Sequence, residues 1–483
     1  MNYGSATWRN LFWSLPSSLQ NTGAAIYGIR HNAKTFGKYY NQCYDFLQKS
    51  QWFSSEELEN YQNEKTVNFL KYAVDTVPYY RRFFAEKGLT AKDIRRVDDL
   101  GLFSLLDKEA VRLNGAALVS DPFRNKKSQI VNAHTSGTTG KGLHLMLSRE
   151  AFQREYAFRW LHFSWAGIVP GVRIAFFAGH PVARPTRMVP PFWIIDKWNK
   201  TIYFSSQHIA PVTLPAYIAQ LKQFGAHVIR GYPSSVHTIA SAILESGETS
   251  IRPRAVFTNS ETLRDYQRAA IEKAFLCKVY DWYGNAEQVA NIVECEEGRL
   301  HVKEEHSLIE FLKPDGSEAR PGETGEMVCT GFGNPAMPLI RYRIGDLAVL
   351  SAESCDCKRG GRIVERIIGR MEDIVVTPEG RHVGRLDHLF KDMLNVKEAQ
   401  IVQNEVDSVK IRIVKRPQFD DKDVRLLMEE ARLRLGHRIK IDLEFVDEVK
   451  REPSGKVRFV ISSVSPSIPG MIDTEISQDN KEQ

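Results

Sequence analysis

The sequence has little cysteine, no long apolar run and no block of like charge, and each absence excludes a class of protein. Six cysteines in 483 residues are too few for the disulfide framework of a small secreted domain, so we expect a reducing, cytoplasmic location. No segment reaches the roughly 18 uninterrupted apolar residues of a membrane-spanning helix, and Pro16 interrupts the first apolar stretch too early for a signal peptide. The net charge of +6 is spread over residues of both signs, which argues against a nucleic-acid partner.

The N-terminal segment is aromatic, with Trp8, Phe12, Trp13 and Tyr27 close together in the chain. We expect these side chains to pack onto the protein's own core, where large apolar side chains are usually found. Peripheral contact with a membrane surface or with a partner is the alternative interpretation.

The length of the chain predicts two or more domains with a substantial core. Residues 1–126 show mainly helical spacing of apolar side chains. Residues 127–371 alternate strand-like and helical segments, which is typical of an α/β domain. Residues 372–463 predict a smaller α+β unit, and residues 464–483 have the Ser, Pro and charge content of a disordered tail.

Two local patterns are specific enough to place individual elements. Ser54 and Glu57 have the spacing of a capping box, which predicts a helix start at that point. The C-terminal unit has alternating patterns that predict strands at 398–402, 409–414 and 441–445 and a helix at 421–435.

Residues 134–142 combine three glycines, four hydroxyl side chains and Lys141 between two strand-like segments. Consecutive backbone N–H groups in such a loop form an anion-binding nest, to which the hydroxyls and the lysine add further donors. The segment is not a Walker A sequence, because the GxxxxGK[ST] pattern is absent. It therefore predicts a phosphate-binding loop, with a solvated turn as the alternative.

Two pairs of metal-binding side chains are a second signal: Cys295 with His301, and Cys355 with Cys357. Three thiolates and one imidazole form the closed ligand set of a structural zinc site. The spacing within these pairs is less specific for zinc than that of two CxxC motifs. His306 could replace His301 as the fourth ligand. The alternative is four unlinked residues, with the cysteines acting as small core side chains.

Five motifs stand in one order along the chain, at residues 134–142, 283–287, 342–346, 369–373 and 453–456. Their order and spacing resemble the ANL superfamily of adenylate-forming enzymes over roughly residues 60–462. Within that superfamily, residues 77–81, 230–234 and 260–263 look like the phenylacetate–CoA ligase-like branch.

This resemblance implies a large multi-sheet α/β N-terminal domain followed by a small, mobile α+β C-terminal domain. It implies ATP- and Mg²⁺-dependent activation of a carboxylic acid as an acyl-adenylate, followed by transfer of the acyl group. In the family the small domain rotates between the two half-reactions about a hinge, which falls here at Glu372. Relatives often have Asp at the hinge and Pro at the position of Gly142, so both segments depart from the common pattern.

The resemblance also gives roles to individual residues, of which Lys456, Glu287 and Arg370 are the implied catalytic ones. Lys456 would stabilise charge on the α-phosphate and the substrate carboxylate, Glu287 would help to hold Mg²⁺, and Arg370 would contact the ribose or a phosphate. Tyr283 would pack on the adenine, and Asp346 would accept hydrogen bonds from the ribose hydroxyls. Taken singly these are ordinary residue types, and only their joint order supports the assignment. The other residues implied in ATP or AMP binding are Thr135, Ser136, Gly137, Thr138, Thr139, Gly140, Lys141, Ser260, Glu261, Gly284 and Asn285.

The acyl pocket is expected among Gly179, His180, Tyr232 and Tyr280, close to several strand ends. Their aromatic character favours a flat or apolar acid. The implied acceptor is CoA, as in an acid–CoA ligase. A second hypothesis is transfer to an amine or hydroxyl of a sugar without CoA, because the N-terminal region resembles members associated with capsule or surface-polysaccharide synthesis. A third is a nucleotide-binding scaffold that has lost catalysis.

Overall fold

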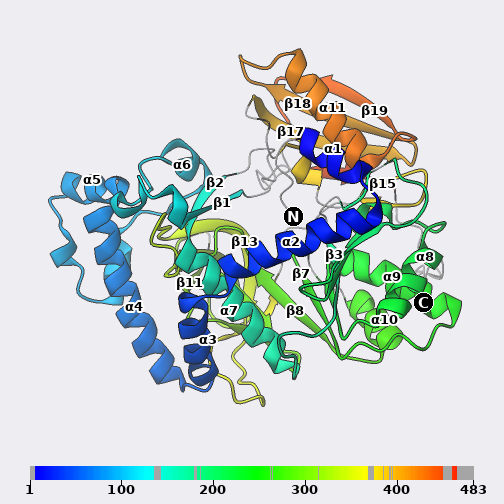
Figure 1. Ribbon diagram of the computed structural model, residues 1–483. Helices are drawn as coiled ribbons and strands as arrows, with labels where there is room; N and C mark the ends of the chain where they lie inside the picture. Colours follow the sequence, from blue (N-terminus) through cyan, green and yellow to red (C-terminus); the bar gives the residue numbers. More distant parts are fainter. Residues whose placement is uncertain are drawn as a thin grey trace, which may run out of the picture.

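A large mixed sheet runs through the protein, helices cover both of its faces, and a smaller C-terminal unit follows (Figure 1). The computed structural model describes residues 6–134, 143–178, 182–184, 186–261, 263, 265–313, 315–367, 375–383, 386–390, 393, 395–449 and 459–464. The predicted α/β class, with a C-terminal domain after the large sheet, is confirmed. In the described residues, hydrogen bonding joins the main strands of the large part into one 12-stranded sheet, and a two-stranded hairpin stands apart from it.

The N-terminal region is helical, as its apolar spacing predicts. Its α-helices are α1 (Ala6–Ser14), α2 (Ser17–Thr35), α3 (Lys38–Ser50), α4 (Ser55–Thr76), α5 (Pro78–Glu86) and α6 (Lys108–Leu113). Short 3₁₀ turns follow or interrupt them at η1 (Ala91–Asp93), η2 (Val97–Leu102), η3 (Asp121–Phe123) and η4 (Lys127–Gln129). The predicted capping box is confirmed: Glu57 N–H donates to Ser54 Oγ at 3.2 Å, and Ser54 N–H donates to the Glu57 carboxylate at 2.8 Å.

The N-terminal aromatic residues divide between core and surface. Trp13 is only 4% exposed, and Phe12 packs against Ala24 and Ile194, so both dock on the protein itself as expected. Tyr27 keeps 36% of its surface, and the side chain of Trp8 lies outside the described residues. In the described part of the chain, no helix is both long and apolar enough to cross a membrane.

Five parallel strands form the middle of the large sheet, in the spatial order β5-β3-β6-β7-β8. Their bounds are β3 (Ile174–Ala178), β5 (Thr201–Ser205), β6 (Val228–Gly231), β7 (Ala255–Asn259) and β8 (Val279–Gly284). Helix α7 (Arg149–Trp165) covers one face of this section through Phe163, which packs on Phe257 and Tyr280. The other face packs against α8 (Leu214–Phe224), α9 (Pro233–Ser246) and α10 (Asp265–Phe275).

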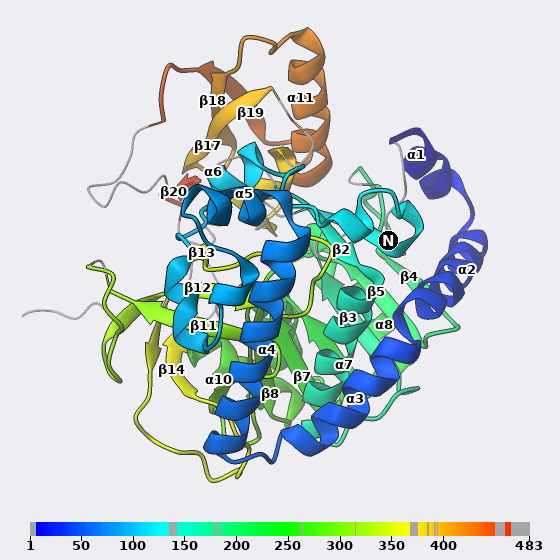
Figure 2. The ribbon, with the colours of Figure 1, turned by 90° about the vertical axis from the view of Figure 1, so that its left-hand side faces the viewer.

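Antiparallel strands extend the sheet on both sides. The strand at one edge is β4 (Trp193–Asp196), which pairs with β5. A short 3₁₀ turn, η5 (Ser206–His208), follows β5 in the chain. Beyond β8 the order is β9 (Asn291–Glu294), β10 (Leu300–Val302), β14 (Ile363–Ile367), β13 (Tyr342–Leu350), β12 (Thr324–Gly331) and β11 (Ser307–Leu312). Figure 2 shows this antiparallel part beside helix α4.

The segments that flank the predicted phosphate loop form a hairpin. Strand β1 (Ile130–His134) pairs antiparallel with β2 (His144–Ser148), and His134 lies opposite His144. The second segment alternates Leu143, Leu145 and Leu147 with polar or less buried residues, and these three leucines, which are 2% to 4% exposed, form its buried face. Residues 135–142, which connect the two strands, lie outside the described residues.

The C-terminal unit (orange in Figures 1 and 2) has its own four-stranded sheet, in the order β19-β18-β17-β20, and its own apolar core. Its elements are β15 (Val375–Val376), β16 (His382–Val383), η6 (Leu386–Phe390), β17 (Val396–Glu405), β18 (Ser408–Lys415), α11 (Asp421–Leu435), β19 (Lys440–Phe445) and β20 (Val460–Ser462). The three strands and the helix predicted there are confirmed. The unit touches the large part through Arg381, whose guanidinium donates to the carbonyl of Gln207.

Candidate active site

The carboxyl ends of five neighbouring parallel strands meet at one edge of the large sheet. Tyr232 follows β6, Ser260 and Glu261 follow β7, and Asn285 follows β8. Ligands of α/β sheets bind outside the carboxyl ends of the parallel strands. The structure therefore brings these predicted residues together from three separate parts of the sequence.

The turn after β7 is strained at Ser260. Its φ is 72°, a left-handed conformation that a residue with a side chain seldom adopts. Ser260 Oγ donates to Asn259 Oδ1 at 3.0 Å, which braces the turn. Glu261 lies partly buried, and its carboxylate accepts from the backbone N–H of Ser234 at 3.1 Å, in the first turn of α9. Glu261 thus ties the end of β7 to a helix N-terminus.

Tyr283 and Asp346 meet although 63 residues separate them. The Tyr283 hydroxyl donates to Asp346 Oδ2 at 2.7 Å, from β8 to β13. Burial, reinforced by the negative charge of Asp346, raises the pKa of Tyr283 well above its ordinary value. The phenol therefore stays protonated at neutral pH and serves as a fixed donor that orients the carboxylate.

Glu287 is a buried carboxyl in the turn after β8, with 5% of its surface exposed. The hydroxyl of Tyr342, which is fully buried on β13, donates to Glu287 Oε1 at 2.9 Å. Asn285 shapes the same turn, because its Oδ1 accepts from the backbone N–H of Val289 at 3.0 Å. Strand β13 thus holds both predicted carboxylates, Glu287 through Tyr342 and Asp346 directly.

Gly284 ends β8 at a point that has no room for a side chain. A Cβ there would lie 2.6 Å from Nε1 of Trp282. Glycine is therefore required if the backbone of the turn that carries Asn285 and Glu287 is to lie against Trp282.

Tyr280 lies in the apolar core between β8 and α7. Side chains alternate along a strand, so Tyr280 points to the α7 face of β8 whereas Tyr283 points to the opposite face. Tyr280 stacks on Phe257 with ring centroids 5.3 Å apart and is 6% exposed. It belongs to the core beneath α7, whereas Tyr232, which directly follows β6, is partly exposed.

Asp281, which lies between these two tyrosines, has no role in the sequence-based predictions. Burial raises its pKa to about 7, and Thr258 Oγ1 donates to Asp281 Oδ1 at 2.6 Å. An acidic residue within an otherwise apolar strand is the signal that could have identified it.

Several predicted residues lie outside the described part of the chain. They are Thr135, Ser136, Gly137, Thr138, Thr139, Gly140, Lys141, Gly179, His180, Arg370, Glu372 and Lys456.

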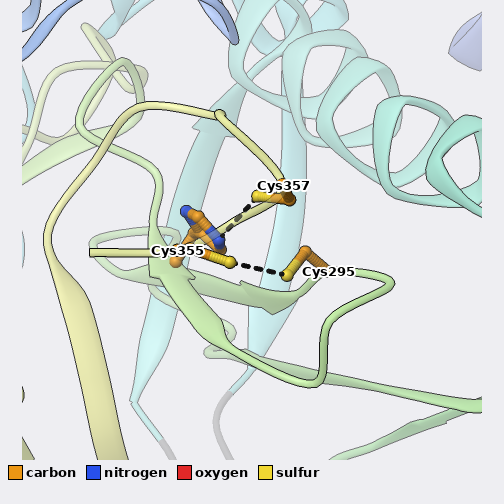
Figure 3. A group of neighbouring side chains, drawn as sticks. Cys295, Cys355 and Cys357 are labelled. Atoms are coloured by element: carbon orange, nitrogen blue, oxygen red, sulfur yellow. Dashed lines mark hydrogen bonds between the residues drawn. The ribbon is translucent and has the colours of Figure 1, made fainter. Parts of the chain in front are cut away.

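The predicted metal ligands converge (Figure 3). One ligand atom from each of Cys295, His301, Cys355 and Cys357 lies within 4.8 Å of all the others. Cys295 Sγ is 3.6 Å from Cys355 Sγ, and Cys357 Sγ is 3.3 Å from His301 Nε2. For zinc–sulfur bonds of about 2.3 Å the edge of a tetrahedron is about 3.8 Å, and it is slightly shorter to nitrogen. The side chains present therefore fit a tetrahedral ion.

Neighbouring backbone groups orient these ligands. His301 Nδ1 lies 3.1 Å from the carbonyl of Gly360, which fixes a proton on Nδ1 and leaves the Nε2 lone pair facing Cys357. Burial lowers the pKa of His301 to about 4, so the imidazole is neutral, which is the form that binds metals. His306, the alternative ligand, instead has its Nε2 3.3 Å from Glu155 and is not part of the cluster.

Comparison with known proteins relates most of the chain to CapK and to phenylacetate-coenzyme A ligases. Residues 375–463 match the family model described as the CapK C-terminal domain. Protein CapK of Staphylococcus aureus is 27% identical over 455 residues, which cover 93% of this chain and 98% of that protein. Phenylacetate-coenzyme A ligase of Escherichia coli K12 is 26% identical over 405 residues, covering 80% of this chain and 85% of the ligase. The chain is a homologue of CapK and of the phenylacetate-coenzyme A ligases.

The solved structures agree on the fold of this CapK homologue. A crystal structure of 2-hydroxyisobutyryl-CoA ligase, in complex with 2-HIB-AMP and CoA in the thioesterification state, superposes with a TM-score of 0.58. The match covers 86% of this chain and 91% of the ligase at 19% identity. The open conformation of the same ligase gives a TM-score of 0.53 at 18% identity. At this identity the comparison establishes that the CapK homologue has the fold of acyl-CoA ligases.

Proposed function

We propose that the protein is an adenylate-forming ligase that activates a carboxylic acid with ATP and Mg²⁺ and then transfers the acyl group to CoA. Homology to phenylacetate-coenzyme A ligases over most of the chain supports a ligase. The observation that carries the proposal is the Tyr283–Asp346 pair at the carboxyl edge of the sheet. It combines an aromatic ring for an adenine with a carboxylate for two ribose hydroxyls in the place where this fold class binds ligands.

The chemistry follows from in-line attack of the substrate carboxylate on the α-phosphorus of ATP, with pyrophosphate leaving. Residues 135–141 would bind the β- and γ-phosphates, and Arg370 would contact the ribose or a phosphate. Glu287 is suited to hold Mg²⁺, which takes carboxylate and phosphate oxygens and would neutralise charge on the nucleotide. Lys456 would stabilise the negative charge that develops between the α-phosphate and the attacking carboxylate.

In the second half-reaction the acceptor must reach the adenylate. We propose that a rotation of the C-terminal unit opens the way for it. The boundary would fall at Glu372, between the large part at 1–371 and the small unit at 372–463. The separate sheet and core of the small unit support this division. The chemistry would take place in the cytoplasm, where ATP and CoA are available.

Transfer of the acyl group to an amine or hydroxyl of a sugar is the second candidate. The similarity to CapK extends over 93% of this chain, and thus farther than the similarity to the ligases. The resemblance of the N-terminal region to members associated with surface-polysaccharide synthesis favours the same candidate.

Pyrophosphate release tests the proposal directly. The purified full-length protein receives ATP, Mg²⁺ and a panel of aryl, fatty and amino acids, with CoA or amino sugars added in separate arms. We expect release with one class of acid and formation of an acyl-CoA in the CoA arm. Product formation only with an amino sugar would replace CoA by the second candidate. ATP binding without release in any arm would leave the scaffold hypothesis and contradict the ligase.

We also propose that Cys295, His301, Cys355 and Cys357 bind a structural zinc ion. The ion would join the turn after β9 and the start of β10 to the loop between β13 and β14, and so stabilise the antiparallel part that includes Asp346. Protein purified without chelator should contain about one zinc per chain, and Cys357→Ser should lower both the zinc content and the melting temperature.

Cys277→Ser is the matched control, because Cys277 is a partly buried cysteine outside the cluster. Its zinc content should equal that of the unmodified protein. A zinc content below about one tenth per chain, or an equal content in both variants, would contradict a site of this kind.

A further inference from the structure

Arg230 is a partly buried arginine on the central strand β6, on the α7 face of the sheet. Its guanidinium lies 4.7 Å from the centroid of the Phe176 ring, and Phe176 is its direct partner on β3. Burial lowers the pKa of Arg230 to about 9. Arg230 precedes Tyr232 by two residues, so both side chains leave the chain on the same face, with Tyr232 nearer the strand ends.

A second arginine, Arg159, approaches from the helix that covers this face. Its guanidinium lies 4.5 Å from the ring centroid of Tyr156 and 5.8 Å from that of Trp282. Arg159 contacts Trp282 on β8 and Arg230 contacts Phe176 on β3, so both arginines lie in the layer between α7 and the sheet. The positive charge of Arg159 adds to the effect of burial in lowering the pKa of Arg230.

Two tyrosines and a histidine lie next to the rings that the two arginines contact. Tyr203 on β5 has its ring 5.9 Å from that of Phe176, in an edge-on arrangement. Tyr156 has its hydroxyl 2.8 Å from Nε2 of His31, which belongs to α2. The surroundings therefore offer hydrogen-bonding groups to an anion as well as positive charge.

No carboxylate neutralises the two arginines among the described residues. Asp196, a buried acid on the edge strand β4, accepts hydrogen bonds from the backbone N–H groups of Trp198 and Asn199 and from Asn199 Nδ2. Three other partly buried arginines have an acidic partner at 2.8 Å, namely Arg268 with Glu294, Arg341 with Glu310 and Arg362 with Glu304. Arg381 and Arg432 have no such partner among the described residues and donate to backbone carbonyls instead.

Two positively charged guanidinium groups without an acidic partner are unfavourable in a partly buried site. Folding alone does not require them, because the same face of the sheet is apolar at neighbouring positions such as Phe257. A bound anion would remove the repulsion, and two guanidinium forks are well suited to carboxylate or phosphate oxygens.

We propose that Arg159 and Arg230 bind a second anionic group of the acid substrate, a carboxylate or a phosphate at the end opposite the carboxylate that is activated. The substrate would then be a dianionic acid and not the purely apolar acid that the aromatic residues suggest. This inference rests on the proposed function. Arg230 lies two residues before Tyr232, and two residues along a strand span about 7 Å. The second anion would therefore lie about 7 Å from Tyr232, on the side away from the carboxyl ends of the strands.

Matched acids test the inference. Pyrophosphate release is measured for hexanoate against adipate and for phenylacetate against 4-carboxyphenylacetate and 4-phosphonophenylacetate. We expect the acids with a second anionic group to have a kcat/KM about 10- to 100-fold higher, the range of one or two charge-assisted hydrogen bonds. Arg230→Met and Arg159→Gln should each lower this ratio at least about tenfold, whereas Arg230→Lys should keep part of it.

Arg254→Gln is the control, because Arg254 is exposed and lies before the first residue of β7, at the other end of the sheet. A preference of the unmodified protein for the monoacids would overturn the inference while leaving the ligase intact. A change confined to the KM for ATP or CoA would overturn it too, by assigning the arginines to those phosphates. No release with any acid would contradict the proposed function instead.

Thermal stability gives a readout that does not depend on turnover. The dianionic acids, added without ATP, should raise the melting temperature of the unmodified protein and of Arg254→Gln but not that of Arg230→Met. Stabilisation that is equal in all three proteins, or absent from all three, would overturn the inference.

Discussion

Replacing Lys456 by alanine should lower the rate of adenylation by at least about two to three orders of magnitude. The reason is that the lysine, placed by resemblance to the family motif at 453–456, would act on charge that develops in the transition state and is smaller in bound ATP. ATP binding should therefore change much less than the rate. The measurement is pyrophosphate release with the preferred acid, together with the Kd for ATP from calorimetry.

Lys422→Ala is the matched control, since Lys422 is an exposed lysine of the same C-terminal unit, on α11. It should adenylate at the unmodified rate. If Lys456→Ala also adenylates at close to that rate, the catalytic assignment of Lys456 is wrong. If it loses ATP binding to the same extent as catalysis, the lysine serves ground-state binding instead.

The parts of the fold that the sequence predicts well are those decided by local chemistry. The capping box at Ser54 and Glu57 depends on residues three apart, and β18 buries alternate side chains along most of its length. Cys295 and Cys357 could be grouped because few side chains bind zinc, although the pattern left the choice between His301 and His306 open. In the structure His301 lies with the three cysteines, and His306 is directed to Glu155.

The contacts that the sequence predicts poorly depend on the order of strands in space. Tyr283 reaches Asp346 across a sheet whose order from β8 runs through β9, β10 and β14 to β13, and no local rule gives that order. Tyr283 is predicted to pack on the adenine and Tyr280 to line the acyl pocket, and alternation along β8 places the two side chains on opposite faces of the sheet. Arg230 was part of a family motif without a role, because its lack of an acidic partner appears only when neighbouring strands and α7 are in place.

Replacing Lys303 by methionine should lower the free energy of unfolding by about 3–5 kcal/mol. Lys303 and Glu305 form an ion pair at 3.2 Å in which both side chains are at most 3% exposed. Ser50 Oγ, at the end of α3, also donates to Glu305 at 2.8 Å. Without the lysine, the carboxylate would remain buried with only that hydroxyl, which is the costly arrangement. Urea unfolding followed by tryptophan fluorescence measures the difference.

The double variant Lys303→Met with Glu305→Gln should recover most of the loss, because a neutral amide can still accept from Ser50 and needs no counter-charge. Lys222→Met is the control, since Lys222 is 55% exposed in its pair with Glu248 at 2.8 Å and should contribute at most about 1 kcal/mol. Equal losses in the two single variants would contradict the argument from burial. A loss in the double variant as large as in Lys303→Met would show that the methylene stem of the lysine, and not its charge, stabilises this junction between α3 and the sheet.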